Sequence, residues 1–145
     1  MGSLEFNSAT YYRYVSLDLG QLADTLGISH SGNTDDLKKA IAVFTQALFV
    51  AIPTARQTTQ SGASPWEFAR VLIRKGQRLQ VPFEQPVKAN VSGYLQPSKE
   101  VLKSYLDSKE KLCGSLFGKV AAYDWGEDES FNIDSLITAL QSHVQ

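Results

Sequence analysis

The stretch Thr34–Pro53, TDDLKKAIAVFTQALFVAIP, decides the fold class of this chain. Thr34 is a good helix N-cap, and Asp35 and Asp36 follow it in the first turn, where the helix dipole favours negative charge. Apolar residues then recur at helical spacing until Pro53 ends the segment: Leu37, Ala40, Ile41, Phe44, Ala47, Leu48 and Ala51. The pattern predicts one long helix with a broad apolar face.

Segments rich in strand-forming residues lie on both sides of that helix. Phe6–Leu19 alternates aromatic and polar residues and predicts a strand, and Trp66–Arg74 predicts a second one. Lys75–Arg78 has the composition of a turn, after which Leu79–Phe83 could return as a short paired strand. Pro82 has no N–H to donate, so that strand would lie at a sheet edge.

Three further helical segments complete the pattern. Gln21–Leu26 predicts a short helical turn, and Ser98 caps a helix that runs to about Leu112. The last helix is predicted from Asp134 to about His143. We expect these side chains of the last two helices to face inward: Val101, Leu102, Tyr105, Leu106, Leu112, Leu136, Ile137 and Leu140. The order of elements predicts an α+β fold in which a small, mostly antiparallel sheet is covered by helices.

Length and composition place the chain among ordinary globular proteins. It has 145 residues, of which 43% are hydrophobic and 20% charged, so we expect one domain over residues 1–145. A single cysteine excludes an internal disulfide. The first residues lack the pattern of a signal peptide, and no apolar run is long enough to span a bilayer. We therefore expect a cytoplasmic protein without membrane contact.

The formal net charge of −1 hides a strong segregation. The segment from Arg56 to Lys88 has a net charge of +4, whereas the segment from Ala121 to the end has a net charge of −5. A basic segment can neutralise phosphates, and an acidic one can repel them or face a basic neighbour. Two ordinary solvated faces would give the same pattern, so both interpretations stay open.

None of the enzymatic motifs is complete. Gly114–Val120 resembles a phosphate-binding loop, but it is one residue short and has Val120 where a magnesium-binding hydroxyl is required. His30 and His143 have no evident catalytic partners, and Cys113 is expected to be a small buried residue. The acidic residues near the C-terminus lack the spacing of a calcium loop. We therefore predict no catalytic residue, no metal site and no cofactor.

The tyrosines of the first predicted strand, Tyr11, Tyr12 and Tyr14, raise the question of nucleic-acid binding. Tyr12 and Tyr14 flank Arg13 on the first predicted strand, in the way that RNA-recognition sheets present stacking aromatics. The glycine-containing signature of that module is absent, so core positions are favoured for both tyrosines. The basic loops are better candidates, because a loop can approach a nucleic-acid backbone.

Short stretches, in the family's order along most of the chain, resemble the CasC family. They are Gly2–Ser8, Tyr12–Tyr14 with Leu17, Leu19 and Gln21–Leu22, Pro53–Gln57 with Thr59, Val87–Ala89 and Gly93–Ser98. That family is the repeated backbone subunit of the type I-E CRISPR complex Cascade. The resemblance implies a palm with a modified RNA-recognition (ferredoxin-like) fold. It covers only the C-terminal portion of the longer family members, so their N-terminal part is expected to be absent.

The resemblance also implies a function and a set of contacts. Such a subunit is not a nuclease; it holds the CRISPR guide RNA, assembles with copies of itself and with other Cascade subunits, and meets target DNA through the guide. Carried over to this chain, Arg56, Gln57 and Thr59 would contact the guide backbone and Lys88 would contact nucleic acid. Each of the four could instead be an ordinary surface residue. The alternative function is a protein-interaction module that keeps only subunit–subunit contacts.

Overall fold

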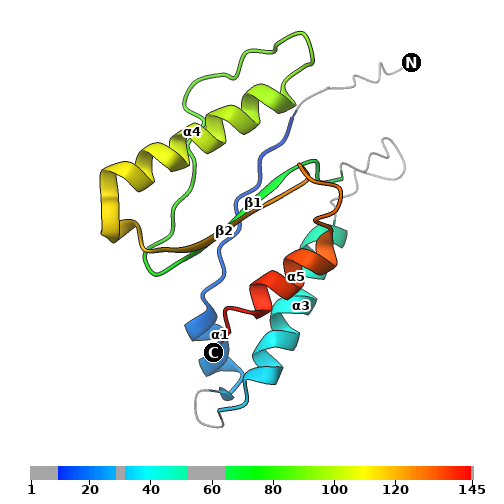
Figure 1. The fold of residues 1–145 in the computed structure, drawn as a ribbon, viewed down its shortest axis with the longest axis vertical. Helices are drawn as coiled ribbons and strands as arrows, with labels where there is room; N and C mark the ends of the chain where they lie inside the picture. Colours follow the sequence, from blue (N-terminus) through cyan, green and yellow to red (C-terminus); the bar gives the residue numbers. More distant parts are fainter. Residues whose placement is uncertain (1–9, 29–31, 52–64, 145) are drawn as a thin grey trace, which may run out of the picture. The chain divides into compact units, whose positions relative to one another are not determined.

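The computed structural model describes residues 10–28, 32–51 and 65–144 (Figure 1). In this part of the chain it contains four α-helices, one short 3₁₀ helix and a two-stranded sheet. The elements, in chain order, are α1 (Leu19–Thr25), α3 (Thr34–Val50), β1 (Ala69–Arg74), α4 (Leu95–Cys113), η1 (Gly114–Phe117), β2 (Lys119–Trp125) and α5 (Ile133–Gln141). The predicted α+β class is confirmed, and the arrangement is consistent with a small ferredoxin-like fold.

The two strands run antiparallel. The Lys75 N–H donates to the Gly118 carbonyl at 2.7 Å beyond one end of the pair, and Glu67 lies against Gly126 at the other end. Strand β1 confirms the strand expected within Trp66–Arg74. Its partner was not predicted: β2 follows only after α4, and no strand forms at Leu79–Phe83.

The N-terminal strand expectation is wrong for the described residues 10–18, which form no strand. Tyr12 explains what this segment does instead. Its ring packs edge-on against Phe83 with the centroids 4.9 Å apart, and its hydroxyl oxygen accepts from the Val81 N–H at 3.3 Å. Asp18 then ends the segment by capping α1, so the chain turns into a helix where the strand was expected to continue.

Helix α3 is confirmed, with a narrower buried stripe than its sequence predicts. Asn33 rather than Thr34 is the N-cap, since its side chain accepts from the Asp35 N–H at 3.2 Å. The buried residues follow an i, i+4 line: Leu37, Ile41, Thr45 and Phe49. Phe44 and Ala47, both expected to face inward, are exposed. The buried hydroxyl of Thr45 fits this line because it donates to the Ile41 carbonyl at 2.8 Å.

Residue contacts divide the chain into two compact units, which are described separately. Unit 1 comprises residues 1–16 and 73–120, and unit 2 comprises residues 17–72 and 121–145. The division passes through both strands, so each unit contains part of the sheet.

In unit 2, α3 and α5 lie side by side (Figure 1). The inward positions predicted for α5 are confirmed: Leu136 and Ile137 are buried and Leu140 is half-buried. In strand β2, the Trp125 ring packs on Phe49 of α3, and the Tyr123 hydroxyl lies 2.7 Å from His143, beyond the end of α5. Asp124, between these two aromatic residues, binds Arg70. Phe49 of α3 packs on the Trp125 ring at 4.9 Å between centroids, which ties the helix to the strand.

In unit 1, α4 begins at Leu95, three residues before the predicted Ser98 cap. Leu106 is buried, and Leu102 and Tyr105 are half-buried, as expected. Val101 and Leu112 are exposed, so the predicted apolar face of this helix is wrong at both ends. No helix in the described ranges combines the length and the apolar character that crossing a membrane requires.

Two glycines of unit 2 allow a direct test of the close approach between the strands. Gly126 has φ +94°, and a Cβ there would collide with the Glu67 carbonyl; Gly27 has φ +70° but open space around it. An alanine in the left-handed region costs about 1–2 kcal/mol, so Gly27→Ala should show only that loss. Gly126→Ala should lose more, because the strand ends must also separate.

Urea unfolding followed by tryptophan fluorescence measures both variants, since Trp66 and Trp125 are the only tryptophans and both belong to unit 2. Equal losses of unfolding free energy would contradict the close approach.

Candidate functional site

The two units have opposite net charges, although Arg56 and Arg70 of the basic segment belong to the acidic unit 2. Unit 1 contains ten lysines and arginines against five acidic residues, a net charge of +5. Unit 2 contains four against ten, a net charge of −6. A candidate site for a polyanion therefore belongs in unit 1.

Several basic side chains already have acidic partners. Arg70 binds Asp124 through two parallel hydrogen bonds, Nε to Oδ1 at 2.7 Å and Nη2 to Oδ2 at 2.8 Å. Lys119 lies 2.9 Å from a Glu110 carboxylate oxygen. These charges are compensated locally and add little to the field that a ligand would meet.

The turn after β1 presents basic groups on a fixed backbone. Arg74 braces it from inside: Nε donates to the Phe117 carbonyl at 2.9 Å and Nη1 donates to the Gln77 carbonyl at 3.1 Å. The guanidinium also lies 4.2 Å from the centroid of the buried Phe117 ring. Lys75 and Arg78, on either side of this brace, are exposed. In this turn Arg74 therefore has a structural role, whereas Lys75 and Arg78 are accessible to a ligand.

Of the four residues predicted from the sequence to contact RNA, the structure describes only Lys88. Arg56, Gln57 and Thr59 lie outside the described residues. Lys88 is described: it is exposed in the segment between the β1 turn and α4, within unit 1. The structure therefore places Lys88 in the same unit as Lys75 and Arg78.

A second turn in unit 1 was not identified as a candidate from the sequence. Asn90 and Gly93 exchange backbone hydrogen bonds of 3.0 and 3.1 Å, and the Asn90 side chain accepts from the Ser92 N–H at 2.8 Å. Gly93 closes the turn with φ +105°. Tyr94 follows the turn as the N-cap residue of α4, and its side chain is half exposed. The Asn-Val-Ser-Gly composition is a turn signal that could have revealed this feature.

Tyr12 is held by the fold of unit 1. Burial raises the pKa of its phenol, while the hydrogen bond from the Val81 N–H acts in the opposite direction. Its ring lies against Phe83 and its hydroxyl accepts a hydrogen bond, but Tyr12 is 39% exposed and Tyr14 is 36% exposed, so the core positions predicted for both tyrosines are wrong.

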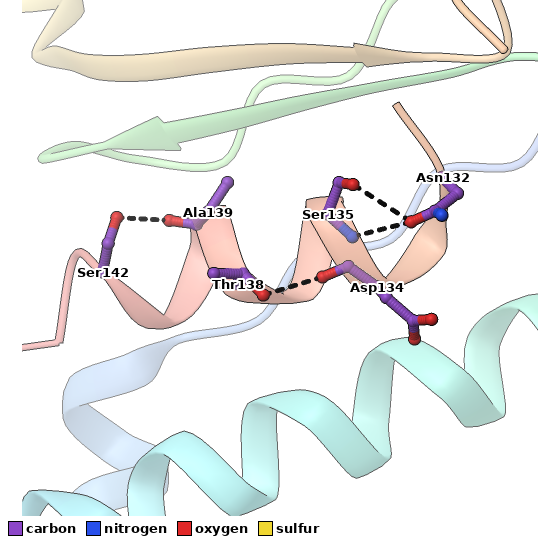
Figure 2. Close-up of a pocket in the computed structure, with 6 residues that line it drawn as sticks. All are labelled: Asn132, Asp134, Ser135, Thr138, Ala139 and Ser142. Carbon is purple, nitrogen blue, oxygen red and sulfur yellow. Dashed lines mark hydrogen bonds between the residues drawn. The ribbon is translucent and has the colours of Figure 1, made fainter. Parts of the chain in front are cut away.

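A shallow hollow on α5 carries no comparable chemistry. Figure 2 shows that its lining residues come from this helix and its cap, and that their polar groups bond locally. The Ser135 N–H and hydroxyl both donate to Asn132, Thr138 donates to the Asp134 carbonyl, and Ser142 donates to the Ala139 carbonyl. These are ordinary hydrogen bonds of a helix and its caps. They explain why polar groups lie here, so no ligand is needed to explain them.

The described residues also offer no metal centre, since they contain no suitable cluster of His, Cys, Asp and Glu. Cys113 is exposed, contrary to the expected burial. His143 lies 2.7 Å from the Tyr123 hydroxyl, which anchors the end of the chain to β2. His30 lies outside the described residues.

A comparison with protein families defines the class of protein. A model of a CRISPR-associated family matches residues 1–136. The chain belongs to that family, the CT1975-like proteins. No curated protein matches the sequence.

The brace of the β1 turn can be tested with Arg74→Lys. The variant keeps the positive charge but loses the planar fork that reaches two carbonyls. Loss of roughly 1.4 kcal/mol of local stability corresponds to about tenfold faster amide exchange. We expect that acceleration at the Lys75 amide, which donates to the Gly118 carbonyl, measured by hydrogen–deuterium exchange. Arg78→Lys, which changes an exposed arginine of the same turn, is the matched control; equal exchange in both variants would contradict the brace.

Proposed function

We propose that this chain is a non-catalytic, RNA-binding backbone subunit of a type I-E CRISPR Cascade complex, of the CasC kind. It holds the guide RNA through unit 1 and assembles with copies of itself and with other subunits. The observation that carries the proposal is the net charge of +5 in one unit of a CRISPR-associated protein. As part of such a complex it acts in the cytoplasm in antiviral defence.

The accessible cations suit contacts with a nucleic-acid backbone. Lys75 and Arg78 project from a braced turn, and Lys88 lies on a separate exposed segment of the same unit. Contacts of lysine and arginine with phosphates position a strand without reading its bases. Base pairing between the guide and target DNA then supplies the sequence specificity.

Assembly with like subunits is supported by the opposite charge of unit 2. Its net charge of −6 disfavours phosphate contact and complements the basic unit of another copy. Lys75, Arg78 and Lys88 of unit 1 would then contact phosphates. Arg56, Gln57 and Thr59, which belong to unit 2 and lie outside the described residues, remain the proposed guide-backbone contacts of that unit.

The same acidic unit favours the alternative function, a protein-interaction module without RNA binding of its own. In that case unit 1 would also face acidic surfaces of protein partners. Retention of Cascade subunits during purification with nuclease, together with no RNA affinity of the isolated chain, would support this alternative.

Salt-dependent binding of single-stranded RNA tests the main proposal. The observed affinity should fall with rising salt, and the logarithmic slope should change by about 0.7 for each phosphate that a variant no longer neutralises. The double variant Lys75→Gln/Arg78→Gln should therefore reduce the magnitude of the slope by ~1.4. Filter binding at several salt concentrations measures it, with two RNAs of unrelated sequence giving the same result.

Lys39→Gln is the matched control, because Lys39 is an exposed lysine of unit 2 that lies 3.7 Å from Asp36. It should leave the slope unchanged. Wild-type protein that binds no RNA at low salt, or that cleaves RNA, would overturn the proposal.

A further inference from the structure

Helix α4 presents one continuous face to solvent. Leu106 is its buried residue, and the side of the helix opposite Leu106 contains Val101, Ser104, Ser108 and Leu112, all of which are exposed. Val101 and Leu112 are 42% and 77% exposed. Their positions differ by eleven, about three helical turns, so both lie on the same side. These four residues are the outer face of α4.

The composition of the outer face differs from that of a helix side that meets only water. A solvated side is expected to be polar, yet both ends of this one are aliphatic. The two serines between Val101 and Leu112 are short, and short side chains at a contact let two helices pack closely. The outer face therefore has apolar ends and a low middle, which suits another helix.

Two exposed charges border the outer face on one side. Glu100 lies in the first half of α4 and Lys111 in its last turn, and their positions also differ by eleven. Among the described residues no ion pair is found for either side chain. Asp107, on the same side, already interacts within the chain. Glu100 and Lys111 are thus the two charges of this border that are available to a partner.

A second copy of the chain fits both the apolar ends and the bordering charges. When two copies of α4 pack antiparallel about a two-fold axis near Leu106, Val101 of each copy meets Leu112 of the other. An antiparallel pair also keeps the charged borders of both helices on one side of the contact. Glu100 of each copy then lies near Lys111 of the other. In a parallel pair the two borders would lie on opposite sides and these charges could not meet.

We propose that the outer face of α4 is the contact between two copies of this chain, packed antiparallel, with Glu100 of each copy paired to Lys111 of the other. A two-fold contact of this kind closes at two copies. It therefore differs from a contact between the oppositely charged units, which can continue from copy to copy. It also needs no RNA, so it goes beyond the proposed function and is tested separately.

Reversal of one charge at a time tests the register. In Glu100→Lys two lysines face each other, and in Lys111→Glu two glutamates do. Each variant should therefore dimerise roughly five- to thirtyfold more weakly than the wild type. An equimolar mixture of the two variants should regain the dimer, because opposite charges then face each other at both places. Sedimentation velocity at several concentrations measures the dissociation constants, with a reductant that keeps the exposed Cys113 from cross-linking copies.

The apolar part of the contact is tested with Leu112→Ser, which should weaken the dimer about tenfold or more, since it removes a leucine from both halves. Two variants of unit 1 outside α4 are matched controls. Glu84→Lys makes the same charge change as Glu100→Lys, and Val91→Ser removes another exposed aliphatic side chain. Both should dimerise like the wild type. Far-UV circular dichroism checks that α4 forms in every variant.

The outcomes separate this inference from the proposed function. Wild-type protein that stays monomeric at every concentration, or a dimer that none of the α4 variants weakens, would overturn the inference and leave RNA binding to the salt titration. A mixture of Glu100→Lys and Lys111→Glu that dimerises no better than either variant alone would overturn the antiparallel register. A wild-type dimer that binds no RNA at low salt would support the inference and overturn the proposed function alone.

Discussion

The antiparallel pairing of β1 with β2 is the constraint on which the rest of the structure depends. A two-stranded sheet is marginal by itself, so side chains and backbone must secure it at several places. Arg70 and Asp124 join the strands through a bidentate ion pair with both side chains largely covered, and such a pair is stronger than an exposed one. At the strand ends, Gly118 and Gly126 allow an approach that a Cβ would block. Because the pairing joins distant segments, α4 becomes an insertion between the strands and α5 follows from the end of β2.

The same pairing decides which charges remain accessible. The net charge of +4 between Arg56 and Lys88 counts six cations, but Arg70 neutralises Asp124 and Arg74 braces a turn against Phe117. Both arginines use the planar guanidinium, which lysine cannot replace at a site with two acceptors. The exposed cations of the described segment are then Lys75, Arg78 and Lys88. Counting charges along the sequence therefore overestimates the positive electrostatic potential that a ligand meets. The division into units shows that the positive net charge belongs to unit 1.

Helices α3 and α5 could be predicted because their information is local. Caps and apolar spacing lie within each segment, and the structure shifts their ends by a few residues at most. Strand β2 could not be predicted, because Lys119–Trp125 contains two alanines and two charges and becomes a strand only through its distant partner. For the same reason Leu79–Phe83 looked like the partner of β1 although Tyr12 and Phe83 hold it otherwise. Lys88 could be found from the resemblance, but the outer face of α4 could not, because apolar spacing predicts that Val101 and Leu112 face inward and only the structure shows both exposed.

The rigid β1 turn also bears on how strongly one chain can hold RNA. The hydrogen bonds within this turn form during folding, so binding need not order the segment again. If Lys75, Arg78 and Lys88 alone each neutralise one phosphate, the salt slope on single strands is about −2. A lone copy would then bind weakly at physiological salt, because few counterions are released. Copies aligned on one RNA would bind far more tightly, since each further binding step becomes intramolecular. Tight RNA binding therefore requires assembly, because one copy alone binds weakly and the oppositely charged units can bring copies together.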